Sequence, residues 1–165
     1  MTPEALRRLI IDAFSGVSRP TGLDLAPHPC DECDHVRALL SQHAFTSVPD
    51  DVLDQLGDSL PLLGPAGLHY YLPAYLLRAL RDPKFEWLDF LLFHLGPSHS
   101  DLSERGDYWS ERLAVFSVAQ RSAVQAFLQW LVGTAEAPDY AEELDRASTR
   151  WAAPQNDKMQ QTRHG

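Results

Sequence analysis

Residues 117–133 have the sequence SVAQRSAVQAFLQWLVG, and they predict the best-defined helix of the chain. Ser117 followed by Gln120 is a capping-box pattern, in which each side chain satisfies a backbone N–H group at a helix start. Apolar residues then recur three and four positions apart until Gly133, a typical helix stop. These apolar residues are Val118, Ala119, Ala123, Val124, Phe127, Leu128, Leu131 and Val132. We expect this helix at the centre of the fold.

The preceding segments predict a second central helix and a long loop. Residues 85–95 carry apolar side chains almost all round a helix, which is typical of a helix buried on most sides. Residues 96–116 are polar and mixed, and they include Gly96, Pro97 and Gly106. We therefore predict an irregular loop with a single helical turn there.

Five further helices are predicted, at residues 3–16, 31–40, from 49, from 65 to 80, and from 138 to 151. Pro73 falls inside the fourth of these and predicts either a kink or a new helix start. Leu and Ala number 25 and 18, against ten Ile and Val together, a balance that favours helices over strands. The prediction is an all-α single-domain bundle of about six or seven helices over residues 1–151. Residues 152–165 lack a periodic apolar face and are predicted to be a disordered tail.

The net charge of −9 over 165 residues excludes some partners and suggests one. Phosphate backbones and anionic headgroups are repelled, so we expect neither nucleic-acid nor membrane-surface binding. Seven acids and one base lie between Asp31 and Asp58, and this stretch holds −6 of the charge. Its acids are interpreted either as helix N-terminal residues, which the helix dipole favours, or as a surface for a basic protein partner.

The sequence also predicts a cytoplasmic location. Asp12 interrupts the apolar run that a signal peptide would need, and no apolar run reaches the roughly twenty residues of a membrane span. The only two cysteines, Cys30 and Cys33, are too few for a disulfide framework, so we expect reduced thiols.

Residues 28–35, HPCDECDH, form the one motif with evident chemistry. Thiolates two residues apart can hold one zinc ion, and His28 and His35 are candidate further ligands beside Cys30 and Cys33. If the chain is helical from Asp31 onward, Cys33 and His35 point about 200° apart around the helix. A closed site would then need a nonhelical turn, or a distant ligand such as His69 or His94. A single Cys-x-x-Cys is a weak zinc signal.

Two alternatives stand beside the zinc hypothesis. In the structural one, Cys30 caps a helix and Cys33 packs as a small buried hydrophobe. In the redox one, the thiol pair at a helix start is reactive, although Asp31, Glu32 and Asp34 oppose the thiolate.

An aromatic block, His69-Tyr70-Tyr71-Leu72-Pro73-Ala74-Tyr75, is a candidate ligand pocket lined by His69, Tyr70, Tyr71 and Tyr75. The alternative is core packing with each hydroxyl satisfied at the edge. His94, His99 and Asp101 are weaker candidates for a base or a ligand, because exposed loop histidines usually serve as neither. The sequence contains no nucleophile elbow, no phosphate-binding loop and no His-Glu-x-x-His pair.

Three segments, taken in order, resemble a bacterial family of unknown function. They are Glu32-Cys33-Asp34, then Leu62-Leu63-Gly64-Pro65-Ala66 leading into the aromatic block, then Phe116-Ser117 with Gln120-Arg121. The resemblance covers about residues 5 to 133, and Tyr-Leu-Pro-Ala-Tyr is its most specific part. It implies a small, soluble, mainly helical protein, and it brings no activity or catalytic residue.

Two functional hypotheses follow from these observations. The first is a noncatalytic binding or regulatory module whose acidic surface meets a basic protein partner. The second is a zinc-dependent enzyme in which His28, Cys30 and Cys33 hold the metal and a water occupies the open position.

Overall fold

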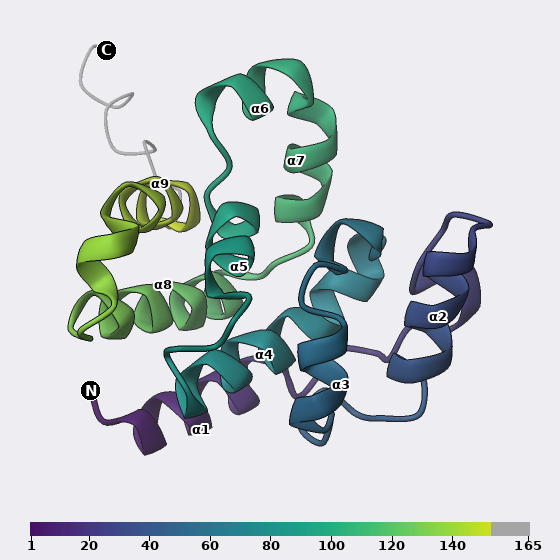
Figure 1. Ribbon diagram of the computed structural model, residues 1–165, viewed down its shortest axis with the longest axis horizontal. Helices are drawn as coiled ribbons and strands as arrows, with labels where there is room; N and C mark the ends of the chain where they lie inside the picture. The colour runs from purple at the N-terminus through teal and green to yellow at the C-terminus, as the bar shows by residue number, and fades with distance from the viewer. Residues whose placement is uncertain (153–165) are drawn as a thin grey trace, which may run out of the picture.

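The computed structural model describes residues 1–152, and all regular structure in them is helical (Figure 1). The predicted all-α class is confirmed, and seven of the nine α-helices have at least seven residues. The α-helices are α1 (Pro3–Phe14), α2 (Asp31–Leu40), α3 (Asp50–Gln55), α4 (Pro65–Arg81), α5 (Leu88–Leu95), α6 (His99–Glu104), α7 (Gly106–Ala114), α8 (Val118–Val132) and α9 (Ala141–Trp151). Three short 3₁₀ turns join them, η1 (Gly22–Asp24), η2 (Leu60–Leu62) and η3 (Ala137–Tyr140). The predicted tail falls, apart from Ala152, outside the described residues.

The capping box of α8 is present as predicted. The backbone N–H of Gln120 donates to Ser117 Oγ at 3.2 Å, and the backbone N–H of Ser117 donates to Gln120 Oε1 at 2.9 Å. The amide group of Gln120 also donates to the carbonyl oxygen of Ala13 at 3.3 Å. The same side chain therefore starts α8 and docks it on α1.

The most buried helix is α4, rather than the segment 85–95 expected at the centre. Most residues of α4 are buried, and Pro73 lies inside one continuous helix rather than starting a second one. The helix in the segment 85–95 begins only at Leu88, and Phe90 and Phe93 stay half-exposed on it. Apolar side chains all round a helix therefore did not identify the central helix. The aromatic residues of α5 cover a neighbouring element instead.

The prediction of an irregular loop at 96–116 is wrong, because α6 and α7 lie there. Ser98 caps α6, its Oγ accepting from the N–H of Asp101 at 3.3 Å. On α7 the buried positions are Trp109 and Arg112. Because one of the two inward residues is charged, the apolar spacing that identifies a helix is broken at this point.

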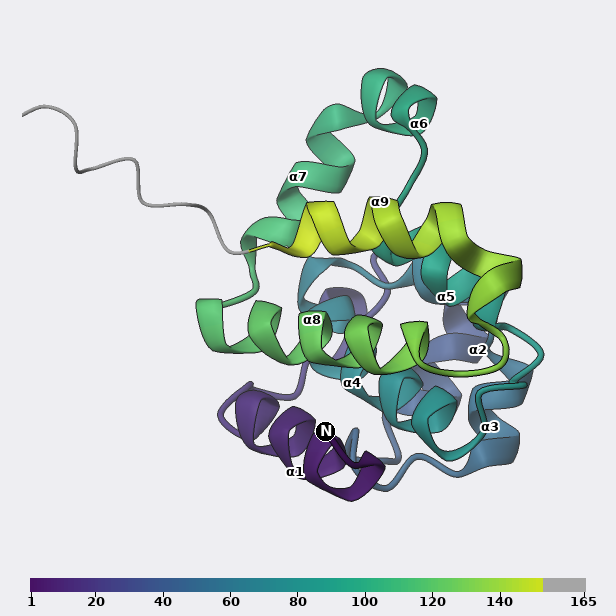
Figure 2. The same ribbon diagram turned by 90° about the vertical axis from the view of Figure 1, so that its left-hand side faces the viewer.

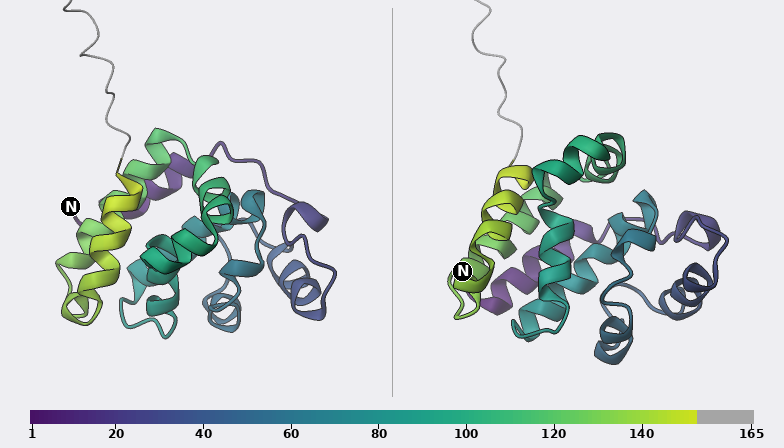
Figure 3. Two further views of the ribbon diagram at one scale, coloured as in Figure 1. Left: turned by 90° about the horizontal axis from the view of Figure 1, so that it is seen from above. Right: turned by 45° about the horizontal axis from the view of Figure 1, so that its top comes forward.

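The helices pack around α4, with α8 lying against α1 and α9, and α9 lying against α5. At the opposite end of the molecule stand α2 and α3 (Figure 3). The pair α6 and α7 projects from the body above α9 (Figure 2). Gly96 follows α5 directly, and a Cβ there would lie 2.4 Å from the backbone nitrogen of Ala147 on α9. Glycine thus allows the end of α5 to approach α9.

Within residues 1–152, no helix combines the length and the apolar character that crossing a bilayer requires.

Candidate functional site

A small cavity lies where α5, α7 and α9 meet. Its volume is about 20 Å³, enough for one water molecule or one atom of a ligand. The residues around it come from four helices and the loop after α7: Leu68, His94, Trp109, Arg112, Leu113, Phe116, Arg150 and Trp151. Two arginines and a histidine are unusual among the lining residues of so small a cavity.

Arg112 is the most informative of these residues, because its side chain is charged and only 5% of the residue is exposed. One terminal nitrogen donates to the carbonyl oxygen of Leu63, and the other donates to that of Leu60 at 2.7 Å. The Nε–H group is buried and has no hydrogen-bond partner. Burial lowers the pKa of Arg112, which nevertheless stays protonated, as arginines in proteins do.

No carboxylate of residues 1–152 lies within ion-pair distance of Arg112. Its guanidinium carbon lies 4.8 Å from the centre of the Tyr108 ring, which shields one face. A buried cation without a counter-charge loses several kcal/mol of hydration, and two carbonyl dipoles recover part of that. Arg112 therefore leaves an uncompensated positive charge and an unused donor at the cavity.

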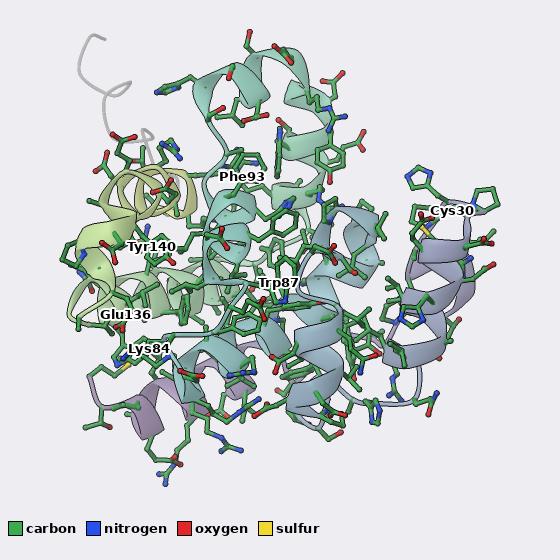
Figure 4. All side chains as sticks on the ribbon, in the orientation of Figure 1. Cys30, Lys84, Trp87, Phe93, Glu136 and Tyr140 are labelled. Carbon is green, nitrogen blue, oxygen red and sulfur yellow. The ribbon has the colours of Figure 1, made fainter. Side chains whose placement is uncertain are left out.

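His94 and Trp109 add further unsatisfied groups. Both ring nitrogens of His94 and the indole Nε1–H of Trp109 are buried without a hydrogen-bond partner, and the two rings lie 5.6 Å apart. Burial, and then the charge of Arg112, lowers the pKa of His94 to about 3. His94 is therefore neutral at physiological pH and offers one N–H donor and one acceptor. Phe93 packs beside both rings, on the side of α5 that faces α7 (Figure 4).

Two more arginines belong to this region: Arg150 lines the cavity, and Arg121 donates to the backbone of two residues that line it. Arg150 donates to the carbonyl oxygen of Trp109 at 2.7 Å, and burial and the charge of Arg121 lower its pKa. Arg121 donates to the carbonyl oxygens of Leu113 and Phe116, at 3.0 and 3.3 Å. Like Arg112, neither contacts a carboxylate among the described residues, although five other arginines do.

Arg112, Arg121 and Arg150, which we call the arginine cluster, thus concentrate positive charge in a protein whose net charge is −9. Arg112 and Arg150 line the cavity, and Arg121 lies behind its lining. Among the described residues, the buried N–H groups without a partner there are those of Arg112 Nε, Trp109 and His94. Anions bind preferentially to hydrogen-bond donors that carry or lie near positive charge. The arrangement is chemically suited to holding a small anionic group.

The cysteine motif lies at the far edge of the molecule, at the start of α2 (Figure 4). Cys30 caps this helix, its sulfur accepting from the N–H of Cys33 at 3.4 Å. Cys33 is fully buried, and this burial raises the pKa of its thiol, while His28 and His35 are exposed. Within residues 1–152, three or more His, Cys, Asp or Glu side chains nowhere gather as a metal site would need. The geometry matches the structural alternative, and zinc binding stays a prediction.

The aromatic block of α4 points into the core rather than into the cavity. Tyr71 and Tyr75 are fully buried, and their hydroxyls donate to the carbonyl oxygens of Leu40 at 2.7 Å and Leu56 at 2.9 Å. Tyr70 packs edge-to-face on Tyr71, and His69 lies 2.8 Å from the side-chain oxygen of Gln120. None of these four residues lines the cavity.

The acids between Asp31 and Asp58 are mostly helix N-terminal residues, as the dipole interpretation predicts. Five of the seven lie in the first turns of α2 and α3. Asp34, Asp50 and Asp54 also pair with Arg37, Arg81 and Arg78 of the same chain. Part of the local charge is therefore compensated internally, and a basic protein partner stays a prediction.

Sequence reasoning missed Trp109, Arg112 and Arg150 altogether, and it considered His94 only in passing. A usable signal existed in the spacing Trp109, Arg112, Leu113, Phe116, which places an arginine on an otherwise apolar helix face. An arginine at such a position is seldom fully buried unless it is paired.

Comparison with known proteins gives one match. Residues 2–155 match the model of a family described as a family of unknown function (DUF6714). Neither the curated proteins nor the solved structures contain a match to the chain.

Proposed function

The chain belongs to DUF6714, a family of unknown function, and from its own cavity we propose that it is a binding module for a small anionic group held between α5, α7 and α9. The proposal retains the binding role that the sequence suggests and moves it from the acidic surface to the arginine cluster.

The observation that carries this proposal is the buried guanidinium of Arg112, which has no carboxylate partner in residues 1–152. Charged side chains are almost never buried unless they are paired. An anion beside Nε would supply both the missing counter-charge and the missing acceptor. The buried N–H of Trp109 and one N–H of His94 would donate to the same anion.

A single water molecule is the competing occupant, since the cavity has room for one. Water would accept from Arg112 and Trp109, but it would leave the charges of the arginine cluster uncompensated. A cavity that binds an anion can be saturated by added anions, whereas a cavity that holds only water cannot. This difference makes the proposal testable with simple salts.

The test is a titration followed at the indole N–H groups by ¹⁵N NMR. Of the four tryptophans, Trp87 and Trp151 already donate to carbonyl oxygens, and Trp109→Phe identifies the signal of Trp109. Sodium formate and sodium chloride are added against sodium fluoride, which is strongly hydrated, at constant ionic strength. We expect a saturable shift of the Trp109 signal with formate or chloride.

Arginine variants show whether that shift belongs to the site. Arg150→Met and Arg121→Gln each remove one positive charge of the arginine cluster, and we expect formate affinity to fall about tenfold in each. Arg105→Gln removes the same charge from an exposed position between α6 and α7, and it should leave the affinity unchanged. An unchanged Trp109 signal at saturating salt, or equal losses in all three variants, would refute an anion site here.

A further inference from the structure

A groove beside the cavity indicates the size and chemistry of the ligand. Its volume is about 360 Å³, and it runs between α6, the end of α7 and the outer face of α9. Leu113 and Arg150 line the groove and the cavity alike, so the two spaces adjoin. Small-molecule sites in proteins start at about 300 Å³, so the groove is large enough for one.

The walls of the groove are amphipathic. Pro97, Leu102 and Leu113 supply apolar surface, and Arg150 supplies positive charge at the end shared with the cavity. The rest of the lining is polar: His99, Asp145, Arg146 and Thr149. A ligand that fits both spaces has an anionic end at Arg150 and Arg112 and an apolar body toward Leu102.

The dimensions of the cavity limit the anionic end. A space for about one water-sized atom admits one oxygen of a flat carboxylate, with the second oxygen toward Arg150. A tetrahedral phosphate carries four oxygens and up to two charges, so it would need more room and lose more hydration. Chloride would fit the cavity, but it has no apolar part that could occupy the groove.

We infer that the ligand is a small organic monocarboxylic acid, whose carboxylate enters the cavity and whose hydrocarbon body lies in the groove between α6, α7 and α9. This inference rests on the proposed function, since it assigns a ligand class to the same anion site.

The experiment compares straight-chain carboxylates of increasing length on the whole chain. Formate, acetate, butyrate and hexanoate are titrated with the Trp109 indole signal as readout, and chloride and phosphate serve as comparators. Each buried methylene is worth about a fourfold gain in affinity, so hexanoate should bind on the order of a hundredfold more tightly than acetate. The gain stops when the groove is full.

A groove variant separates the body of the ligand from its anionic end. Thr149 is exposed and lines the groove, so Thr149→Phe narrows it without adding an indole signal. We expect at least a tenfold loss of hexanoate affinity, with formate affinity unchanged. Ser103→Phe places the same ring at an exposed position of α6 outside the groove lining, and it should alter neither.

The outcomes distinguish this inference from the proposed function. If hexanoate binds no more tightly than formate, or if phosphate binds most tightly, the organic-acid inference is wrong while the anion site stands. Equal losses for formate and hexanoate in Thr149→Phe also contradict the inference. If no anion moves the Trp109 signal, both proposals fail together.

Discussion

Arg150 on α9 donates to the carbonyl oxygen of Trp109 on α7 at 2.7 Å, and this bond fastens the two helices across the cavity. Its guanidinium carbon also lies 5.9 Å from the centre of the Trp109 ring. The residue therefore holds the wall of the site together while adding charge to it. A substitution of Arg150 is therefore expected to change both stability and the proposed anion binding.

Arg112→Met should lower the free energy of unfolding and abolish its dependence on formate. The change leaves the carbonyl oxygen of Leu63 without a donor, which costs about 1–3 kcal/mol, while the oxygen of Leu60 still accepts from the N–H of Leu63. It also removes the charge that a bound anion would compensate. Urea unfolding with and without formate measures both effects. Arg105→Met is the matched control, and a formate dependence that survives in Arg112→Met would contradict the assignment of this residue.

His94 should make the protein less stable as the pH falls from 6.5 toward 3. Its pKa is about 3 in the folded state, below the ordinary value of 6.5 expected for the unfolded chain. The unfolded chain therefore binds the extra proton in this interval, and folding loses about 3 kcal/mol between pH 7 and pH 4. Above pH 6.5 the effect is absent.

The His94→Asn variant isolates this contribution from that of the carboxylates, which titrate in the same interval. Its unfolding free energy should depend less steeply on pH than that of the wild type. The charged neighbours of His94 are Arg112, which lowers its pKa, and Asp101, which raises it, and both remain in the variant. Parallel pH profiles for the two proteins would show that His94 stays accessible to protons when folded.

Gly96→Ala should destabilise the protein where Gly106→Ala does not. A Cβ at Gly96 would meet the backbone of Ala147 at 2.4 Å, so α5 and α9 would have to separate, at a cost of about 1–3 kcal/mol. Around Gly106 a Cβ meets nothing within 4 Å, and the substitution should be neutral or slightly stabilising. Thermal unfolding of the two variants gives the comparison, and equal melting temperatures would contradict the close approach.

Tyr75→Phe tests whether the aromatic block belongs to the core. The Tyr75 hydroxyl is fully buried and donates to the carbonyl oxygen of Leu56 at 2.9 Å. Its removal deletes this hydrogen bond, while the Leu56 oxygen still accepts from the N–H of Ser59 at 3.0 Å. We expect a loss of about 0.5–1.5 kcal/mol in unfolding free energy, the net value of one hydrogen bond, and no change in formate affinity. Reduced formate affinity with unchanged stability would instead place Tyr75 in a ligand site.

The two thiols should react at different rates with a thiol reagent. Cys30 is partly exposed, while Cys33 is buried and its pKa is raised by that burial, so only Cys30 should react in the folded protein. Cys33 should react on unfolding. Elemental analysis of protein purified without an affinity tag provides the second measurement. Protection of both thiols together with one zinc ion per chain would favour the metal site over the structural arrangement.

The elements that the sequence predicts well are those whose signals are local. The capping box at Ser117 and Gln120 depends on residues three positions apart, and it fixes the start of α8. The acids after Cys30 likewise mark the start of α2. Both patterns arise from hydrogen bonds and dipoles within one helix, so no tertiary information is needed.

The cavity could not be predicted in the same way, because its residues are brought together from distant parts of the chain. His94 and Arg150 lie 56 positions apart, and the spacing around Arg112 indicates an unusual arginine but not which residues surround it. The charged Arg112 also interrupts the apolar periodicity that would identify α7 in the sequence. The cavity was not predicted, and the helix α7 in 96–116 was predicted as a loop, for one reason: a charged side chain lies on a buried helix face.

The position of Arg150 and Trp151 at the end of α9 also bears on biosynthesis. Every other residue around the cavity lies at least thirty positions earlier in the chain, so it is synthesised before the part of the wall that α9 provides. The nascent chain therefore lacks a closed cavity until α9 emerges. A chain interrupted before residue 150 would keep Arg112 but lose the end of α9 that covers it, so we expect its cavity to stay open to solvent.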